Sequence, residues 1–200
     1  KKGVWPIMLP EGFSSLVVAD SLGAARHIVV NSNGDIYVKL EQLNDGRGIL
    51  RLRDTDNNAV MDDISGFGNY AGTGIAIKNG YLYASSDDNV YRYKMENNEV
   101  VTTTEEMIVE GLINKREHAS KSITLDDNGF IYVNIGAPSN ACQEKNREKG
   151  SPGMNPCPIL DSAGGIWQFK ADKAKQHYGD GLRYATGIRN IVGLDWNSSA

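Results

Sequence analysis

The sequence has no long hydrophobic run, no excess of positive charge and only two cysteines. No stretch approaches the roughly eighteen consecutive apolar residues of a membrane-spanning helix, so we expect no membrane span. The 21 basic and 25 acidic residues give a formal net charge of −4 and are interspersed along the chain. Nucleic-acid binding needs a basic surface that faces phosphates, so we expect no nucleic acid as a partner.

Helical periodicity is also absent outside the polar loops, which argues against an α-helical fold. The chain instead repeats one hairpin pattern. In residues 122–133, two apolar runs flank the turn residues Asp126, Asp127, Asn128 and Gly129. Asn-Gly between two such runs is a strong hairpin signal, because both residues tolerate the positive φ of a tight turn.

The same hairpin recurs along the chain, near residues 27–38, 74–84 and 122–133, and a fourth copy begins at 193–200. The turn glycines of the first three copies, Gly34, Gly80 and Gly129, are 46 and 49 positions apart. Each of these hairpins is followed by an alternating segment, at 48–54, 89–94 and 165–170. About four antiparallel strands per repeat, at a period of about 40–50 residues, are typical of β-propeller blades.

We therefore predict an all-β protein in which residues 1–200 form a single, incomplete β-propeller domain. It would contain about three four-stranded antiparallel blades and the start of a fourth. Because propellers have roughly 4–8 blades, closing the ring requires the remaining half of the propeller as a partner. We expect residues 13–19 to form a closing strand that pairs with the last blade.

An inserted, turn-rich loop interrupts the third repeat between residues 136 and 163. It contains both cysteines of the chain, Cys142 and Cys157, fifteen positions apart. Because the loop has little apolar content to hold it, we expect a Cys142–Cys157 disulfide, the alternative being two separate buried thiols. A disulfide implies an oxidising compartment, so we expect a periplasmic or secreted protein.

Candidate site residues follow from the alignment of the repeats. When Gly74, Ser122 and Gly193 are set equivalent, the positions four residues earlier are Tyr70, His118 and Arg189, and Asn190 follows Arg189. These residues should project from successive blades toward one mouth of the central channel. An imidazole there suits proton abstraction, and a guanidinium can stabilise an oxyanion.

Simpler interpretations of the same residues remain open. A single histidine such as His118 on a strand-entry loop is more often a surface or hydrogen-bonded residue than a base. Acidic residues near the hairpins resemble calcium ligands, but Asp is also favoured in turns for backbone reasons. We interpret them as turn residues and predict no metal ligand in this chain.

The chain resembles the soluble dehydrogenases of the glucose/sorbosone type that depend on pyrroloquinoline quinone (PQQ), most closely the sorbosone dehydrogenase branch. The similarity covers nearly all 200 residues. Its matching segments are residues 9–13 (LPEGF), 72–76 (GTGIA), the third hairpin with the His118 loop, 138–142 (PSNAC), 155–158 (NPCP), 163–167 (AGGIW), 183–190 (RYATGIRN) and 192–194 (VGL). The segment 183–190 is the most specific of these.

The resemblance implies a six-bladed propeller, of which this chain would be the N-terminal half. It further implies oxidation of a sugar, or of a sugar-derived aldehyde or alcohol, by hydride transfer to the quinone. By resemblance, His118 would be the general base, and Arg189 and Asn190 would bind the quinone oxygens. Calcium would accompany PQQ, with ligands beyond Ala200, and an external electron acceptor would complete turnover. We expect the partial chain alone to be inactive.

Two other classes of propeller stay open at this point. A calcium-dependent lactonase needs a carboxylate among its central ligands, and the aligned positions supply none, although Glu117 adjoins His118. A non-catalytic binding propeller would keep the blades and lose the polar rim.

Overall fold

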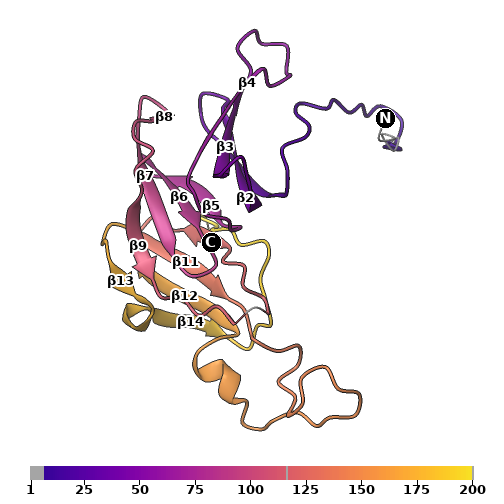
Figure 1. The fold of residues 1–200 in the computed structure, drawn as a ribbon, viewed down its shortest axis with the longest axis vertical. Helices are drawn as coiled ribbons and strands as arrows, with labels where there is room; N and C mark the ends of the chain where they lie inside the picture. The colour runs from indigo at the N-terminus through magenta and orange to yellow at the C-terminus, as the bar shows by residue number, and fades with distance from the viewer. Residues whose placement is uncertain (1–6, 116, 200) are drawn as a thin grey trace.

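The computed structural model describes residues 7–115 and 117–199, and most of its regular structure is antiparallel β-sheet (Figure 1). Three four-stranded units follow one another along the chain. The first contains β1 (Ala25–Val30), β2 (Ile36–Asn44), β3 (Arg47–Arg53) and β4 (Asp63–Phe67). The second contains β5 (Ile75–Lys78), β6 (Tyr81–Ser85), β7 (Val90–Glu96) and β9 (Glu106–Glu110). The third contains β10 (Ile123–Leu125), β11 (Phe130–Ile135), β12 (Gly165–Lys170) and β14 (Leu182–Thr186).

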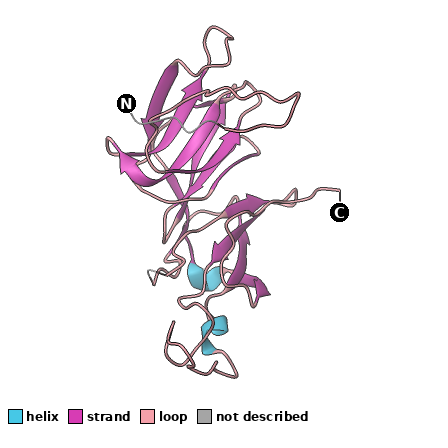
Figure 2. Cartoon of the chain, turned by 90° about the vertical axis from the view of Figure 1, so that its right-hand side faces the viewer, coloured by secondary structure: helices cyan, strands magenta, loops and turns pink. Residues whose placement is uncertain are grey.

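These units are the predicted propeller blades, so the predicted fold class is confirmed. In each blade the strands pair antiparallel in chain order. Helical structure in the described residues is confined to the 3₁₀ turns η1 (Pro158–Asp161) and η2 (Tyr178–Asp180), seen as short helices in Figure 2. The described part of the chain contains no helix with the length and hydrophobicity that a membrane crossing requires.

The repeated glycine turns occupy the same corner of each blade, where the first strand turns into the second. At Asn79 and Gly80 both residues have positive φ, of 49° and 76°, as a two-residue hairpin turn requires. In the third blade, Asp126 Oδ1 accepts hydrogen bonds from the backbone N–H groups of Asn128 and Phe130. This contact supports the interpretation of Asp126 as a turn residue.

Stacking of the blades creates the hydrophobic core. Side chains such as Tyr37, Leu82 and Tyr93 fill the interface between the first and second blades. Val90, Ile123 and others fill the interface between the second and third. The middle strand β6 of the second blade is buried along most of its length, because the first and third blades cover its two faces. In the third blade, Tyr132 of β11 packs instead on Tyr184 and Trp196.

Two short additional strands extend the second blade. β8 (Glu99–Val100) pairs with β7, and β13 (Gln176–His177) runs parallel to β9. The buried Gln176 side chain donates to the carbonyl oxygens of Ile108, Lys170 and Lys173. A segment between β12 and β14 of the third blade therefore fastens that blade to the second.

The first strand of each blade lines a channel. Residues of β1, β5 and β10, together with residues 194–196 and 198, line an open cavity of about 360 Å³. The chain enters these inner strands at one end of the channel, while the glycine turns lie at the other. Any site on the entry loops is therefore presented at the mouth opposite the turns.

Two predicted strands are absent from the described residues. Residues 13–19 form no strand; the carbonyl of Val18 accepts one hydrogen bond from Met61 N, and Ala19 packs against the first blade. Residues 193–199 of the fourth predicted hairpin also form no strand, and Ala200 lies outside the described residues. A strand requires a hydrogen-bonded neighbour, and neither segment has a continuous one within the described chain.

Candidate functional site

The backbone of Ala137, just after β11, joins two of the predicted site residues. Its N–H donates to the carbonyl oxygen of Arg189 at 2.8 Å, and its carbonyl oxygen lies 2.6 Å from Nδ1 of His118. The loop that enters the third blade and the segment that follows β14 therefore meet at one residue. The structure places His118, Arg189 and Asn190 in one neighbourhood at the entry end of the blades.

The contact with Ala137 determines which ring nitrogen of His118 carries the hydrogen in the neutral imidazole. A carbonyl oxygen can only accept, so Nδ1 must be the donor. The other nitrogen, Nε2, is then left with a free lone pair and can accept a proton. This is the arrangement that a histidine base needs.

The backbone of His118 is left-handed, with φ of +51°. This conformation is uncommon for a residue with a side chain. The neighbouring chain is equally restricted at Gly136, where a Cβ atom would lie 2.5 Å from both Cβ and the carbonyl oxygen of His118, and 3.0 Å from Oδ1 of Asn190. Glycine at position 136 therefore allows the two loops to approach β11 closely.

Asn134, near the end of β11, connects the same two segments through its side chain, which is fully buried. Its Nδ2 donates to the carbonyl oxygen of Ser120 at 3.0 Å and to Oδ1 of Asn190 at 2.8 Å. Its Oδ1 accepts from the backbone N–H of Ile191 at 3.1 Å. Three hydrogen bonds from one amide thus hold the His118 loop against the Asn190 segment.

Lys121 supports the His118 loop from within the protein. Its side chain is completely buried, and Nζ donates to the carbonyl oxygen of Ala119. Burial lowers the pKa of Lys121 to about 8, and the carboxylates of Asp87 and Asp88 offset only part of that effect. The backbone carbonyl of Ala119, the residue after His118, is therefore held by a buried ammonium group, and burying that charge is costly.

The inserted loop reaches the same entry loop through Glu117. Oε1 of Glu117 accepts from Asn146 Nδ2 and from Arg147 Nε, each at 3.0 Å. The hydrogen bond from Arg147 lowers the pKa of Glu117. The inserted loop is consequently linked to the residue that precedes His118, although it projects away from the blades (Figure 1).

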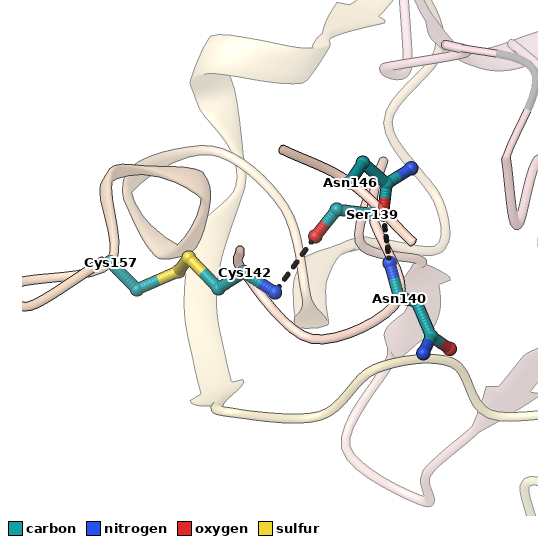
Figure 3. The surroundings of a disulfide bond; sticks show 5 residues. All are labelled: Ser139, Asn140, Cys142, Asn146 and Cys157. Atoms are coloured by element: carbon teal, nitrogen blue, oxygen red, sulfur yellow. Dashed lines mark hydrogen bonds between the residues drawn. A yellow bond between two sulfur atoms is a disulfide. The ribbon is translucent and has the colours of Figure 1, made fainter. Parts of the chain in front are cut away.

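The two cysteines close this loop. Cys142 and Cys157 form a disulfide, and no free cysteine is present in the described residues. Figure 3 shows the bridge together with two hydrogen bonds at its base, from Cys142 N to Ser139 Oγ and from Asn140 N to Asn146 Oδ1. The disulfide therefore stabilises the same loop that supplies Asn146 to Glu117.

Arg189 lies at the edge of a separate cavity of about 210 Å³ beneath the disulfide. Most of its lining is apolar, including Ala137, Leu160 and Ile188 beside the two cysteines. The Arg189 residue itself is exposed, so its guanidinium is accessible to a ligand. The site thus combines an accessible cation, a histidine with a free Nε2 and an adjoining apolar hollow.

Tyr70 does not join this group, contrary to the expectation from the repeat alignment. Its ring packs on Tyr91 at a centroid distance of 4.4 Å, and its hydroxyl lies 3.0 Å from that of Tyr93. Nζ of Lys39 lies 4.4 Å from the centre of the ring. An aromatic side chain gains more from burial between the blades than from exposure at the mouth.

Asn134, Gly136 and Lys121 were not expected as site residues from the sequence. The sequence did carry a signal for Asn134, because this residue interrupts an otherwise apolar strand. The structure shows that its side chain is fully buried. A buried amide in such a strand needs specific hydrogen-bond partners. Those partners come from segments that lie far apart in the sequence, so they could not be assigned without the structure.

Comparison with known proteins relates the whole described chain to one family. A family model described as TrAA12-like matches residues 7–200. No match to the chain was found among curated protein sequences.

Solved structures with the same fold include three relatives. The PQQ domain of a pyranose dehydrogenase from Coprinopsis cinerea, in its holo form, is 19% identical with a TM-score of 0.69, over 88% of this chain and 42% of that one. A calcium structure of a Trichoderma reesei Carbohydrate-Active Enzymes Family AA12 protein is 21% identical with a TM-score of 0.72, over 93% of this chain and 46% of that one. A putative oxidoreductase (glucose dehydrogenase) from Thermus thermophilus is 16% identical with a TM-score of 0.58, over 91% and 57%. The chain thus spans about half the length of these structures.

Proposed function

Because this chain belongs to the TrAA12-like family of PQQ-dependent oxidoreductases, we propose that it forms part of a PQQ-dependent enzyme that oxidises a sugar. In this proposal His118 is the general base, and Arg189 and Asn190 bind the quinone oxygens. The observation that carries the proposal is the position of Ala137, whose backbone holds the His118 ring on one side and the Arg189 segment on the other.

The residues present suit PQQ in their chemistry. PQQ is an anionic quinone whose oxygen atoms accept hydrogen bonds. Arg189 is an exposed guanidinium, and the amide of Asn190 has an NH₂ group to donate. When bound, PQQ supplies the acceptor for the hydride that leaves the substrate carbon.

His118 would take the proton that the substrate hydroxyl loses as its carbon gives up the hydride. The proton goes to Nε2, because Nδ1 already donates to Ala137. The carbonyl of Ala137 also stabilises the imidazolium that results, since it accepts the Nδ1 hydrogen in both protonation states. A positioned base of this kind typically accelerates proton transfer by a factor of about 10²–10⁴.

Arg189 and Asn190 would stabilise the negative charge that develops as the quinone gains electrons. A guanidinium in place before the reaction needs no reorganisation as that charge appears. Because the carbonyl of Arg189 is fixed on Ala137, its backbone position is tied to that of His118. The same hydrogen bond would keep the backbones of the base and of the cationic residue in a fixed relative position.

Calcium is a separate case, because no group of three or more metal-binding side chains occurs among residues 7–115 and 117–199. We therefore derive no step from the ion. The proposal keeps the expectation that calcium ligands lie outside these residues.

The lactonase alternative is not favoured by the surroundings of Glu117. This carboxylate, the nearest in sequence to His118, is engaged by Asn146 and Arg147 of the inserted loop. These contacts hold Oε1 of Glu117 on the inserted loop. The oxidoreductase proposal uses no carboxylate at this position.

A titration of the full-length protein tests the proposal. PQQ is added with calcium chloride, and the absorption spectrum of the quinone is followed before and after addition of glucose, pyranose sugars and sugar-derived aldehydes. We expect a bound quinone that at least one sugar reduces and that an external electron acceptor reoxidises. If the protein binds no PQQ, or if no sugar reduces the bound PQQ, this function is excluded.

The disulfide further supports a periplasmic or secreted location.

A further inference from the structure

We propose that Asn134 is a positioning residue that sets the direction of the Asn190 side-chain amide, so that Asn190 presents its NH₂ group to the site. This inference rests on the proposed function for its ligand, PQQ. Asn134 is fully buried and cannot itself contact a ligand. Any effect it has on the site must pass through the residues that it holds.

The orientation of the Asn134 amide follows from its two backbone partners. The N–H of Ile191 can only donate, so the atom of Asn134 that faces it must be the oxygen. The carbonyl of Ser120 can only accept, so the atom that faces it must be the nitrogen. The usual ambiguity between amide oxygen and nitrogen is therefore absent at this residue.

The orientation of Asn190 follows from that of Asn134. The second hydrogen of Asn134 Nδ2 points at the Asn190 side chain, 2.8 Å away, and only the Asn190 oxygen can accept it. The NH₂ group of Asn190 is then turned away from Asn134, and it makes no hydrogen bond among the described residues. The buried amide of Asn134 thus determines which end of the partly exposed Asn190 amide is available to a ligand.

The available end decides what the site can bind. A quinone oxygen accepts hydrogen bonds, and it does so more strongly as it gains negative charge. The NH₂ of Asn190 would attract such an oxygen, whereas the opposite orientation would place two oxygens against each other. The chemistry that this arrangement recognises is an anionic, oxygen-rich ligand beside Arg189.

The test is Asn134→Asp in the full-length protein. The introduced carboxylate could still accept from Ile191, but it could no longer donate to Asn190 or to the carbonyl oxygen of Ser120. Asn190 should then rotate to donate its NH₂ to the carboxylate and present its oxygen to the site. We expect the Kd for PQQ, measured by absorbance titration with calcium chloride, to rise at least tenfold. Asn31→Asp is the matched control, because Asn31 is a buried asparagine at the turn end of the first blade; its Kd should stay within twofold of the parent.

A double-mutant cycle separates positioning from a general loss of structure. Asn190→Ala alone should weaken PQQ binding, and Asn134→Asp should add nothing in its presence, because the group that it turns has been removed. Losses that add in the double variant, or a Kd for Asn134→Asp within twofold of the parent, would overturn the inference.

Two further measurements decide the matter if Asn134→Asp does not fold or if the parent binds no PQQ. Asn190→Asp keeps the oxygen that Asn134 contacts and replaces the NH₂ with a charged oxygen. It should therefore bind PQQ more weakly than Asn190→Ala, and equal affinities would contradict the inference. Without PQQ, NMR should show fast hydrogen exchange with water at the Asn190 side-chain NH₂ of the parent. A protected NH₂ would show the opposite orientation and overturn the inference, whatever the protein binds.

Discussion

Nδ1 of His118 lies 2.6 Å from the carbonyl oxygen of Ala137, and the N–H of the same Ala137 holds the carbonyl of Arg189. His118→Ala in the full-length, PQQ-loaded enzyme should therefore remove the base while the Arg189 segment keeps its anchor. We expect PQQ affinity to stay within about threefold of the parent and kcat to fall by a factor of about 10²–10⁴. Stopped-flow reduction of the bound quinone by sugar measures the affected step.

His177→Ala is the control for that experiment, because the His177 side chain is 72% exposed and its Nδ1 lies 3.1 Å from Oε1 of Glu110 in the second blade. In the His177→Ala enzyme, sugar should reduce the bound quinone at the parent rate. A His118 variant that also keeps the parent rate would show that another group takes the proton.

Arg189→Ala should impair cofactor binding as well as turnover. The variant loses an exposed guanidinium, while the backbone contact with Ala137 is retained. We expect the Kd for PQQ to rise by more than tenfold and kcat at saturating PQQ to fall as well, because the charge on the reduced quinone is less stabilised. Arg47→Ala removes an exposed arginine of β3 and should change neither quantity. Unchanged PQQ affinity in Arg189→Ala would refute its assigned role.

Removal of the disulfide should loosen the inserted loop and, through it, the entry loop before His118. A bridge across fifteen positions contributes about 3 kcal/mol by restricting the unfolded chain. Cys142→Ser with Cys157→Ser should lower the free energy of unfolding by up to that amount and make the loop more sensitive to limited proteolysis. Denatured, unreduced parent protein should show no free thiol with a thiol reagent. Two reactive thiols would contradict the bridge.

Lys39 should make the stability of the protein depend on pH. Its Nζ donates to the carbonyls of Gly48 and Tyr70 inside the protein, and burial lowers its pKa to about 7, an effect that Asp87 only partly offsets. The unfolded chain keeps the ordinary pKa of about 10.5. Between these values the unfolded state binds a proton that the folded state has released, so stability rises with pH.

Lys39→Met removes this dependence, so the free energy of unfolding of the variant should rise less between pH 7 and 9.5 than that of the parent. Urea denaturation at the two pH values measures the difference. Lys149→Met, at an exposed position in the inserted loop, should keep the slope of the parent. An identical slope in Lys39→Met would show that the buried lysine does not titrate in this range.

Much of the fold could be predicted because the repeats carry the information locally. Hairpins around Gly34, Gly80 and Gly129 need only their own turn residues and flanking apolar runs, and they gave the blades and their order. β13 could not be predicted in this way. It pairs with β9, more than sixty residues earlier, and it is held by one amide, that of Gln176, rather than by an apolar pattern.

Candidate site residues could be predicted only where their position follows from the alignment of the sequence repeats. His118 and Arg189 occupy equivalent positions in the repeat, and in the structure both segments contact the backbone of Ala137. Tyr70 occupies such a position too, but the register does not determine where a side chain finds its best contacts, and Tyr91 and Tyr93 provide them. Asn134 lies outside the register argument, because its role comes from hydrogen bonds between distant segments.

The left-handed backbone of His118, with φ of +51°, has a consequence for engineering. A residue with a side chain in this conformation costs roughly 1–2 kcal/mol, which glycine would avoid. His118→Gly would relieve this strain and lose the hydrogen bond from Nδ1 to Ala137, so a library screened for heat resistance alone exerts no selection for the proposed base. Selection for thermostability should therefore be paired with a turnover screen, because the backbone strain at His118 is kept for a side chain whose proposed role is catalytic.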